Sequence, residues 1–462
     1  MKRYLLLFGL LPALLLNCTG SRTTPRTDAG TGDKQLADRQ SGKAPQVVEQ
    51  LDIAKVWPGH PVGFSLLTHP PHQYVAYYDQ DRHLTVAYRR LGQNRWTYQV
   101  LPTRVGWDSH NYIAMALDRN GHLHLSGNMH SDTLKYFYAT RPHDITSIRR
   151  MPGMTGREEL RTTYPEFFNG PAGEMIFAYR DGSSGSGNQI YNRYDPAQNV
   201  WKRLLDTPLV DGEGLMNAYL KGPLVGPDGY YHLVWVWRDT PDAATNHDLS
   251  YARSKDLIHW EKSNGTPLRL PITLATAEII DPVPAKGGMI NGNTVIGFDA
   301  QQRPVITYHK YDGQGNTQIY NARREATGWK LYQATDWQHR WEFGGGGSIE
   351  AEVGVQPVQV SRSGQLTMAY KSKRAGDGLL VLDPTTLKPV QTLPFPVKTP
   401  PALLNAETLF PGIQVNIRED DNTVPEPDSR YILRWETLGR NRDRPRQGPI
   451  PEPGMLRLYR LR

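Results

Sequence analysis

From about residue 47 onward, bulky apolar residues alternate with polar ones in short runs that end at turn residues. One unit recurs, a polar turn that often contains glycine followed by a strand with bulky residues at alternate positions. A period of two is typical of a β-strand with one buried face. The copies of this unit occupy residues 81–88, 120–125, 172–179, 228–235, 302–308 and 363–370.

The spacing of the copies predicts a repeat architecture. Successive copies begin roughly 40 to 70 residues apart, the length of one four-stranded propeller blade with variable loops. With two further strand patterns at 431–435 and 455–461, the copies suit about seven blades. The sequence therefore predicts an all-β fold, a seven-bladed β-propeller in a single domain, with an array of β-sandwiches as the alternative. Residues 254–260 are similar to a degenerate Asp-box turn of such folds.

Composition agrees with a sheet protein. The 462 residues include 43 Gly and 36 Pro, which punctuate sheets more than helices, and the 10% aromatic content excludes a disordered chain. A single cysteine excludes a disulfide framework and a cysteine-based metal site. The net charge is +7, but the basic residues are scattered without long runs. We therefore expect an acidic substrate and no nucleic-acid partner.

The N-terminus predicts export. Lys2 and Arg3 precede an apolar run at 4–16 that is too short to span a bilayer permanently, and Cys18 follows it. The residues around Cys18 resemble a bacterial lipobox, in which the cysteine is acylated, and an ordinary secretory signal is the alternative. We expect a signal peptide at 1–18, a flexible tether at 19–46 and the propeller at 47–462. The protein would then be lipid-anchored in the cell envelope, at the outer membrane or in the periplasm.

Polar motifs gather at the predicted strand ends. They lie at 107–112, 127–130, 163–166, 179–182, 217–219 and 246–248. In a propeller such loops meet at the central opening, and polar groups on loops of a rigid scaffold often bind or react. No carboxylate pair of the glycosidase type can be identified from the sequence. His110, His130, Tyr164 and Arg180 instead provide cations and a phenol.

This set suits β-elimination beside a uronic acid. That reaction needs a cation to neutralise the sugar carboxylate, a base for the C5 proton and an acid for the leaving oxygen. A tyrosine that serves as the base needs its pKa lowered by neighbouring cations.

These motifs, together with 59–64, 435–438 and 441–444, resemble the BNR-repeat propeller family over nearly the whole mature chain. That family contains ulvan lyases and enzymes that act on L-rhamnosyl-α-1,4-D-glucuronate. The spacing of His110 and His130, and that of Tyr164 and Arg180, matches the lyases of the family. The resemblance implies a monomeric lyase that cleaves L-rhamnose-α-1,4-D-glucuronate linkages in acidic plant or algal polysaccharides.

The resemblance also implies roles for residues. Arg180 and His110 would neutralise the C6 carboxylate, and Tyr164 would take the C5 proton and protonate the leaving oxygen. His130 would orient the tyrosine or hold a metal. No cofactor is required in this scheme, although a bound calcium or zinc ion is considered. The implied substrate contacts are Tyr219, Asn111, Asn217 and His247.

Two alternatives stay open. Glycoside hydrolase family 145 resembles the same propellers and removes terminal rhamnose from glucuronate through one histidine on the opposite face. His60 is the candidate for that role. The second alternative is a propeller that binds glycans without catalysis.

Overall fold

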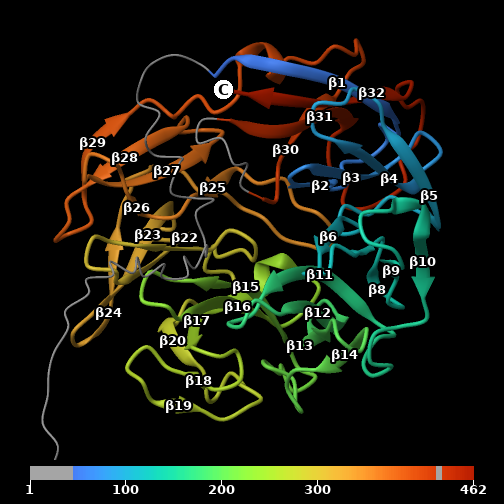
Figure 1. Ribbon diagram of the computed structural model, residues 1–462. Coiled ribbons are helices and arrows are strands. Elements are labelled where there is room, and N and C mark those ends of the chain that lie inside the picture. Colours follow the sequence, from blue (N-terminus) through green and yellow to red (C-terminus); the bar gives the residue numbers. More distant parts are fainter. Residues whose placement is uncertain (1–44, 423–428) are drawn as a thin grey trace, which may run out of the picture.

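The computed structural model describes residues 45–422 and 429–462. These residues form 32 β-strands and three short 3₁₀-helices, and they contain no α-helix, so the prediction of an all-β fold is confirmed. Figure 1 shows the sheets following one another around a central region. The predicted signal peptide, Cys18 and nearly all of the predicted tether lie outside the described residues.

The first and last strands of the described chain share one sheet. In sheet order, this sheet contains β1 (Val47–Val56), β32 (Gly454–Leu461), β31 (Arg430–Leu438) and β30 (Ile413–Glu419). β1 pairs antiparallel with β32 along nearly its full length, from Val47 opposite Leu461 to Val56 opposite Gly454. The two ends of the fold are therefore held by backbone hydrogen bonds.

Two four-stranded antiparallel sheets follow. The first contains β2 (Ser65–His69), β3 (His72–Tyr78), β4 (His83–Arg90) and β5 (Thr97–Arg104). The second contains β6 (Ile113–Leu117), β7 (Leu123–Gly127), β9 (Tyr136–Ala139) and β10 (Ile148–Met151), with the helix η1 (Ile145–Ser147) before β10.

The largest sheet has 11 strands because two units are joined in it. Its first part contains β8 (His130–Asp132), β11 (Thr162–Asn169), β12 (Met175–Ser183), β13 (Ser186–Asp195) and β14 (Val200–Arg203). Its second part contains β15 (Asn217–Val225), β16 (Tyr231–Arg238), η2 (Ala243–Thr245), β17 (Asn246–Ser254), β18 (Trp260–Glu261), β19 (Pro267–Leu268) and β20 (Glu278–Asp281). A single parallel pairing, Gly187 with Asn217, links the two parts.

Two further sheets complete the described fold. One contains β21 (Val295–Phe298), β22 (Pro304–Tyr311), β23 (Thr317–Glu325) and β24 (Gly328–Gln333). The other contains β25 (Val353–Val355), β26 (Gln359–Val360), β27 (Leu366–Ser372), β28 (Gly378–Leu382) and β29 (Pro389–Leu393), and the helix η3 (Pro401–Leu404) follows it.

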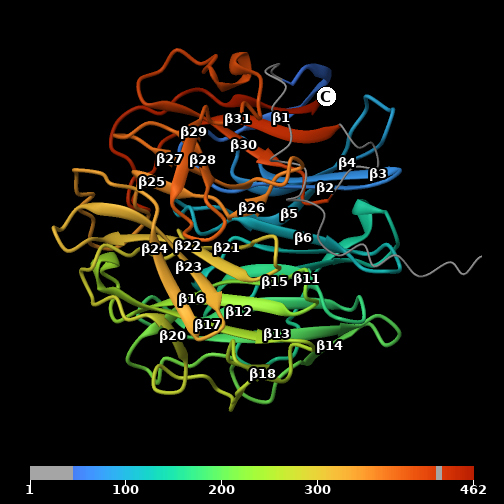
Figure 2. The same ribbon diagram turned by 90° about the vertical axis from the view of Figure 1, so that its left-hand side faces the viewer.

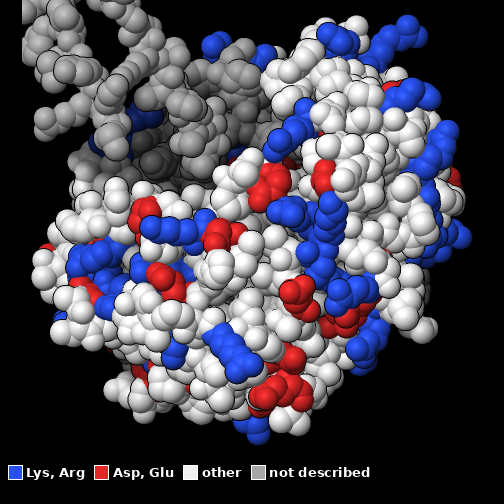
Figure 3. Space-filling model, turned by 60° about the horizontal axis from the view of Figure 1, so that its bottom comes forward, with Lys and Arg blue, Asp and Glu red and all other residues white. Residues whose placement is uncertain are grey.

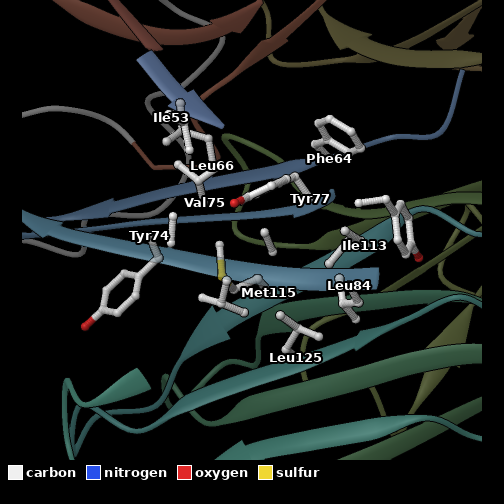
Figure 4. Close-up of a cluster of buried hydrophobic side chains, with 14 of the residues drawn as sticks. Ile53, Phe64, Leu66, Tyr74, Val75, Tyr77, Leu84, Ile113, Met115 and Leu125 are labelled. Atoms are coloured by element: carbon white, nitrogen blue, oxygen red, sulfur yellow. The ribbon is translucent and has the colours of Figure 1, made fainter. Parts of the chain in front are cut away.

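Apolar side chains fill the space between neighbouring sheets. The side view in Figure 2 shows adjacent sheets lying face to face. One cluster joins Ile53 of β1, Leu66 of β2, Val75 of β3, Met115 of β6 and Leu125 of β7, all buried (Figure 4). Burial of such side chains supplies the main stabilising free energy of the fold.

The recurring unit recognised in the sequence corresponds to strands. The six copies end on β4, β7, β12, β16, β22 and β27, and each of these is an inner strand of its sheet. The polar residue that begins the turn explains the pattern, since its side chain caps the turn. The Asp118 carboxylate accepts hydrogen bonds from the backbone N–H groups of Asn120 and His122, at 2.9 Å each.

The Asp-box prediction is also confirmed. The Asp256 carboxylate accepts from the backbone of Ile258 and His259, and Trp260 is buried with its indole N–H donating to the Leu257 carbonyl.

Charged side chains of both signs share the surface. Figure 3 shows lysine and arginine interspersed with aspartate and glutamate over the face in view. In the part of the chain that the structure describes, no helix has the length and apolar character needed to cross a bilayer.

Candidate active site

A cleft of about 960 Å³ lies where the first strands of neighbouring sheets begin. It is reached by residues just before or at the start of β2, β6, β8, β11 and β15. Four of the six predicted motifs contribute to its lining, whereas those at 179–182 and 246–248 do not. Its lining includes His110, His130, Tyr164, Tyr219 and Arg238, together with Ser348, Arg418 and Arg440.

Asp108 holds two histidines at the cleft. Its Oδ1 accepts from Nδ1 of His110 at 2.7 Å, and its Oδ2 accepts from Nδ1 of His130 at 2.5 Å. The two rings stack with their centroids 4.2 Å apart. An ionised carboxylate only accepts, so each Nδ1 carries the proton. Among the described residues, the Nε2 atoms of both rings have no protein partner, so both are available to a ligand in the cleft.

The charge of Asp108 is favoured by this arrangement. Burial by itself raises its pKa, but the hydrogen bonds from His110 and His130 outweigh burial and hold the pKa of Asp108 well below its usual range. Asp108 belongs to a motif that the sequence analysis singled out, but no role was expected for it. Its position two residues before His110 was the available signal.

A second carboxylate, Asp443, faces the same ring nitrogen of His110 as Asp108 does. Its Oδ2 is 3.4 Å from His110 Nδ1. Burial alone lowers the pKa of His110, but the hydrogen bonds to Asp108 and Asp443 raise it to about 9. His110 is therefore positively charged at neutral pH. Asp443 comes from the long loop between β31 and β32, and its distance from His110 in sequence gave no signal of the contact.

The expectation that His60 lies on the opposite face is wrong. His60 Nε2 is 3.3 Å from Oδ1 of Asp443, the carboxylate that also contacts His110. The His60 side chain has no exposed surface, and His60 does not line the cleft. It belongs to the support of the same site, since its ring also lies 6.5 Å from that of Trp107, in the loop that carries His110.

Tyr164 enters the cleft through an irregularity in its strand. The pairing of β11 with β12 shifts register between Thr163 and Glu166, and Tyr164 has a φ of +57°, which is rare for a bulky residue. Its ring centroid lies 5.8 Å from that of His110 and 6.2 Å from that of Tyr219. Burial raises the pKa of the Tyr164 hydroxyl well above its ordinary value, although Arg180 and Arg238 act in the opposite direction. The phenol is therefore protonated at neutral pH.

The two arginines near Tyr164 differ in access. Arg180 is buried behind the tyrosine, with its guanidinium carbon 4.9 Å from the ring centroid and Nη2 donating to Thr163 Oγ1 at 3.0 Å. It does not line the cleft. Arg238 does line the cleft, and its guanidinium carbon lies 5.5 Å from the ring centroid of Tyr219.

Arg238 was missed by the sequence analysis. Its guanidinium donates to the backbone carbonyls of Thr240 and Pro241 and to Oδ1 of Asn291. Within the described residues it has no salt bridge, so its charge is available to an acidic ligand. The sequence contained only a weak indication of Arg238, because it is a single basic residue at the end of the fully buried strand β16.

Of the four predicted substrate contacts, only one lines the cleft. Tyr219 lines the cleft, and its hydroxyl lies 2.8 Å from Ser184 Oγ. Asn111, Asn217 and His247 do not line the cleft. Asn111 and Asn217 are buried, and His247 lies between the carboxylates of Asp239 and Asp248, at 3.0 and 2.9 Å.

Asp108, His110 and His130 have the composition of a metal site, with one ligand atom of each within 4.8 Å of the others. Their spacing, however, is that of hydrogen bonds. The Nδ1 atoms are 2.7 and 2.5 Å from the carboxylate oxygens, whereas two ligands on one zinc ion at about 2.0 Å lie roughly 3.3 Å apart. As arranged here, the two Nδ1 atoms and the Asp108 oxygens are too close together to share a calcium or zinc ion.

Comparison with known proteins agrees with this architecture. A family model described as "BNR repeat-containing family member" matches residues 72–337, more than half of the chain. The chain belongs to this family. A search of curated proteins found no match.

The BNR-repeat chain is also similar in fold to solved lyases. The structure of the polysaccharide lyase Uly1 has a TM-score of 0.59 and 14% identity, covering 90% of this chain and 99% of that chain. An ulvan lyase of family PL25 bound to -[GlcA(1-4)Rha3S]- has a TM-score of 0.58 and 14% identity, covering 88% and 95%. These likenesses show a shared fold.

Proposed function

We propose that this protein is a polysaccharide lyase that cleaves L-rhamnose-α-1,4-D-glucuronate linkages of acidic plant or algal glycans by β-elimination. The observation that carries the proposal is the pair of imidazoles with Nδ1 bound to Asp108, in a cleft that Tyr164 also lines. The Tyr164 ring lies 5.8 Å from that of His110, centroid to centroid. A general base and a general acid close to one another are what this reaction requires.

The proposed step removes the C5 proton of glucuronate, forms a C4–C5 double bond and breaks the C4–O bond, and the departing oxygen takes a proton. The sugar carboxylate must be neutralised first, because the C5 proton becomes acidic only when the developing negative charge is stabilised. Charged His110 and Arg238 both line the cleft and are assigned this role. Arg180, buried behind Tyr164, is assigned an indirect role through the tyrosine.

The remaining groups supply the proton transfers. Burial keeps Tyr164 protonated, so we assign it as the acid that protonates the leaving oxygen. His130 Nε2, opposite an Nδ1 that already donates to Asp108, is assigned as the base that takes the C5 proton. This division differs from the sequence-based expectation that Tyr164 does both, because a phenol that burial keeps protonated is not available to take the C5 proton.

Three further expectations belong to the proposal. The order of the sheets in Figure 1 supports the seven-bladed propeller, with the 11-stranded sheet counted as two blades. The related ulvan lyase bound to a glucuronate–rhamnose ligand supports a substrate of this class. Export and lipid anchoring through Cys18 are tested by labelling cells with a palmitate analogue, where Cys18→Ser should abolish incorporation.

The activity is tested by incubating the protein with ulvan and gum arabic oligosaccharides. A lyase produces an unsaturated uronate, so ultraviolet absorbance rises and no free rhamnose appears. Release of free rhamnose without that rise would show a hydrolase instead. Binding of the oligosaccharides with neither product would show a glycan-binding propeller and contradict the proposal.

A further inference from the structure

We propose that Asp443 is a positioning residue that makes the two imidazoles of the cleft unequal, so that His110 carries the positive charge and His130 remains the base. This inference rests on the proposed function for its catalytic meaning. Its structural part, the unequal charging of the two rings, stands on geometry alone.

The contacts of Asp108 with the two histidines are nearly equivalent. Each ring donates Nδ1 to one oxygen of Asp108, at 2.7 and 2.5 Å, and the side chains of His110 and His130 are exposed to a similar extent, 23% and 28%. One carboxylate balances the charge of one imidazolium, and two charged rings 4.2 Å apart would repel. Asp108 therefore does not determine which ring is charged.

Asp443 breaks this symmetry because it contacts only one ring. Its Oδ2 is 3.4 Å from His110 Nδ1, and its side chain is 8% exposed. The groups that face His110 are the carboxylates of Asp108 and Asp443, the ring of His130 and the Tyr164 ring. Two negative charges on one side of His110 favour its cationic form.

Asp443 is held in place by donors from three separate loops. Its Oδ1 accepts from the backbone N–H and the hydroxyl of Ser109, at 3.0 Å each, and lies 3.3 Å from His60 Nε2. Its Oδ2 accepts from the backbone N–H of Ser348 at 2.7 Å. The fully buried His60 thus serves as a hydrogen-bond donor that holds the Asp443 side chain in position.

The glycine run at 344–347 allows the loop before Ser348 to approach the loop that carries Asp443. Arg442 donates to the carbonyls of Gly344 and Gly346, at 2.7 and 3.3 Å. Gly347 has a φ of +74°, and a Cβ there would be 2.4 Å from the Arg442 carbonyl oxygen. Only glycine permits this contact, which seats Asp443 next to Ser348.

The test compares the wild type with Asp443→Asn, which preserves shape but removes the charge. The protonation of His110 and His130 is followed by NMR of ¹⁵N-labelled histidine side chains across pH, with signals assigned from His110→Gln and His130→Gln. We expect the titration of His110 to move to lower pH by about one unit or more in Asp443→Asn. The alkaline limb of the lyase rate should move by the same amount. Asp383→Asn, in an exposed turn between β28 and β29, is the matched control and should titrate as the wild type does.

An Asp443→Asn protein that folds and leaves the titration of His110 unchanged would overturn the inference. If the variant does not fold, the wild-type titration decides: a charged His130 beside an uncharged His110 at neutral pH overturns the inference, and the reverse supports it. A wild type without lyase activity but with the expected titrations would refute the proposed function and leave the role of Asp443 intact.

Discussion

His110 and His130 stack with their ring centroids 4.2 Å apart and share one carboxylate, Asp108, through their Nδ1 atoms. Any change in that carboxylate therefore acts on both rings at once. The shared contact fixes both tautomers and leaves both Nε2 atoms available to the cleft.

We expect Asp108→Asn to lower the lyase rate by about 10²- to 10⁴-fold, because an amide nitrogen donates and cannot accept from an Nδ1–H. The rate of unsaturated product formation measures the effect. Asp248→Asn is the matched control, since Asp248 pairs with His247 at 2.9 Å but lies outside the cleft lining. Equal rates in the two variants would contradict the role of Asp108.

Tyr164→Phe should lower kcat by at least about 10²-fold with little change in the free energy of unfolding. The hydroxyl of Tyr164 has no protein hydrogen-bond partner among the described residues, so its loss costs little stability. Tyr219→Phe, which loses only the contact with Ser184, is the comparison and should retain most of its kcat. Turnover by Tyr164→Phe near the wild-type level would require another acid.

Arg238→Gln should lower kcat/KM by about 10-fold or more and raise KM, since it removes a charged donor from the cleft wall that is assigned to the sugar carboxylate. Arg180→Gln should instead lower kcat, because Arg180 contacts Tyr164 and not the cleft. Steady-state kinetics on one oligosaccharide separate the two effects. If Arg180→Gln raised KM and Arg238→Gln did not, Arg180 would be the group that binds the sugar carboxylate.

The stability of the fold should depend on the charge of His110. Its pKa is raised from 6.5 to about 9 in the folded state, so its contribution is fully present below about pH 6.5 and is lost as the pH rises through about 9. The difference amounts to at most about 3 kcal/mol. Urea unfolding at several pH values measures it, with His110→Gln as the control that lacks this dependence. A wild type whose pH dependence matches that of His110→Gln would contradict the raised pKa.

Much of the site was predicted from short-range patterns. The motifs that contain His110, His130, Tyr164 and Tyr219 stand at strand starts, and strand order alone brings them to one cleft. Arg180, Asn217 and His247 stand in similar motifs but do not line it. The alternation of a strand shows which residues share a face, whereas access to the cleft depends on bulges such as the one at Tyr164.

The sequence by itself determined the all-β fold, since alternating strands separated by capped turns leave few other ways to bury their apolar faces. It also determined the residue types that meet at the cleft. Only the tertiary structure decided which of them reach a ligand and which support others. Asp443 is more than 300 residues from His110 and His60 in the chain, and the three meet because the last loops of the fold pack against the first. The charge of a side chain depends on such neighbours, because electrostatic interactions follow distance in space and not along the chain.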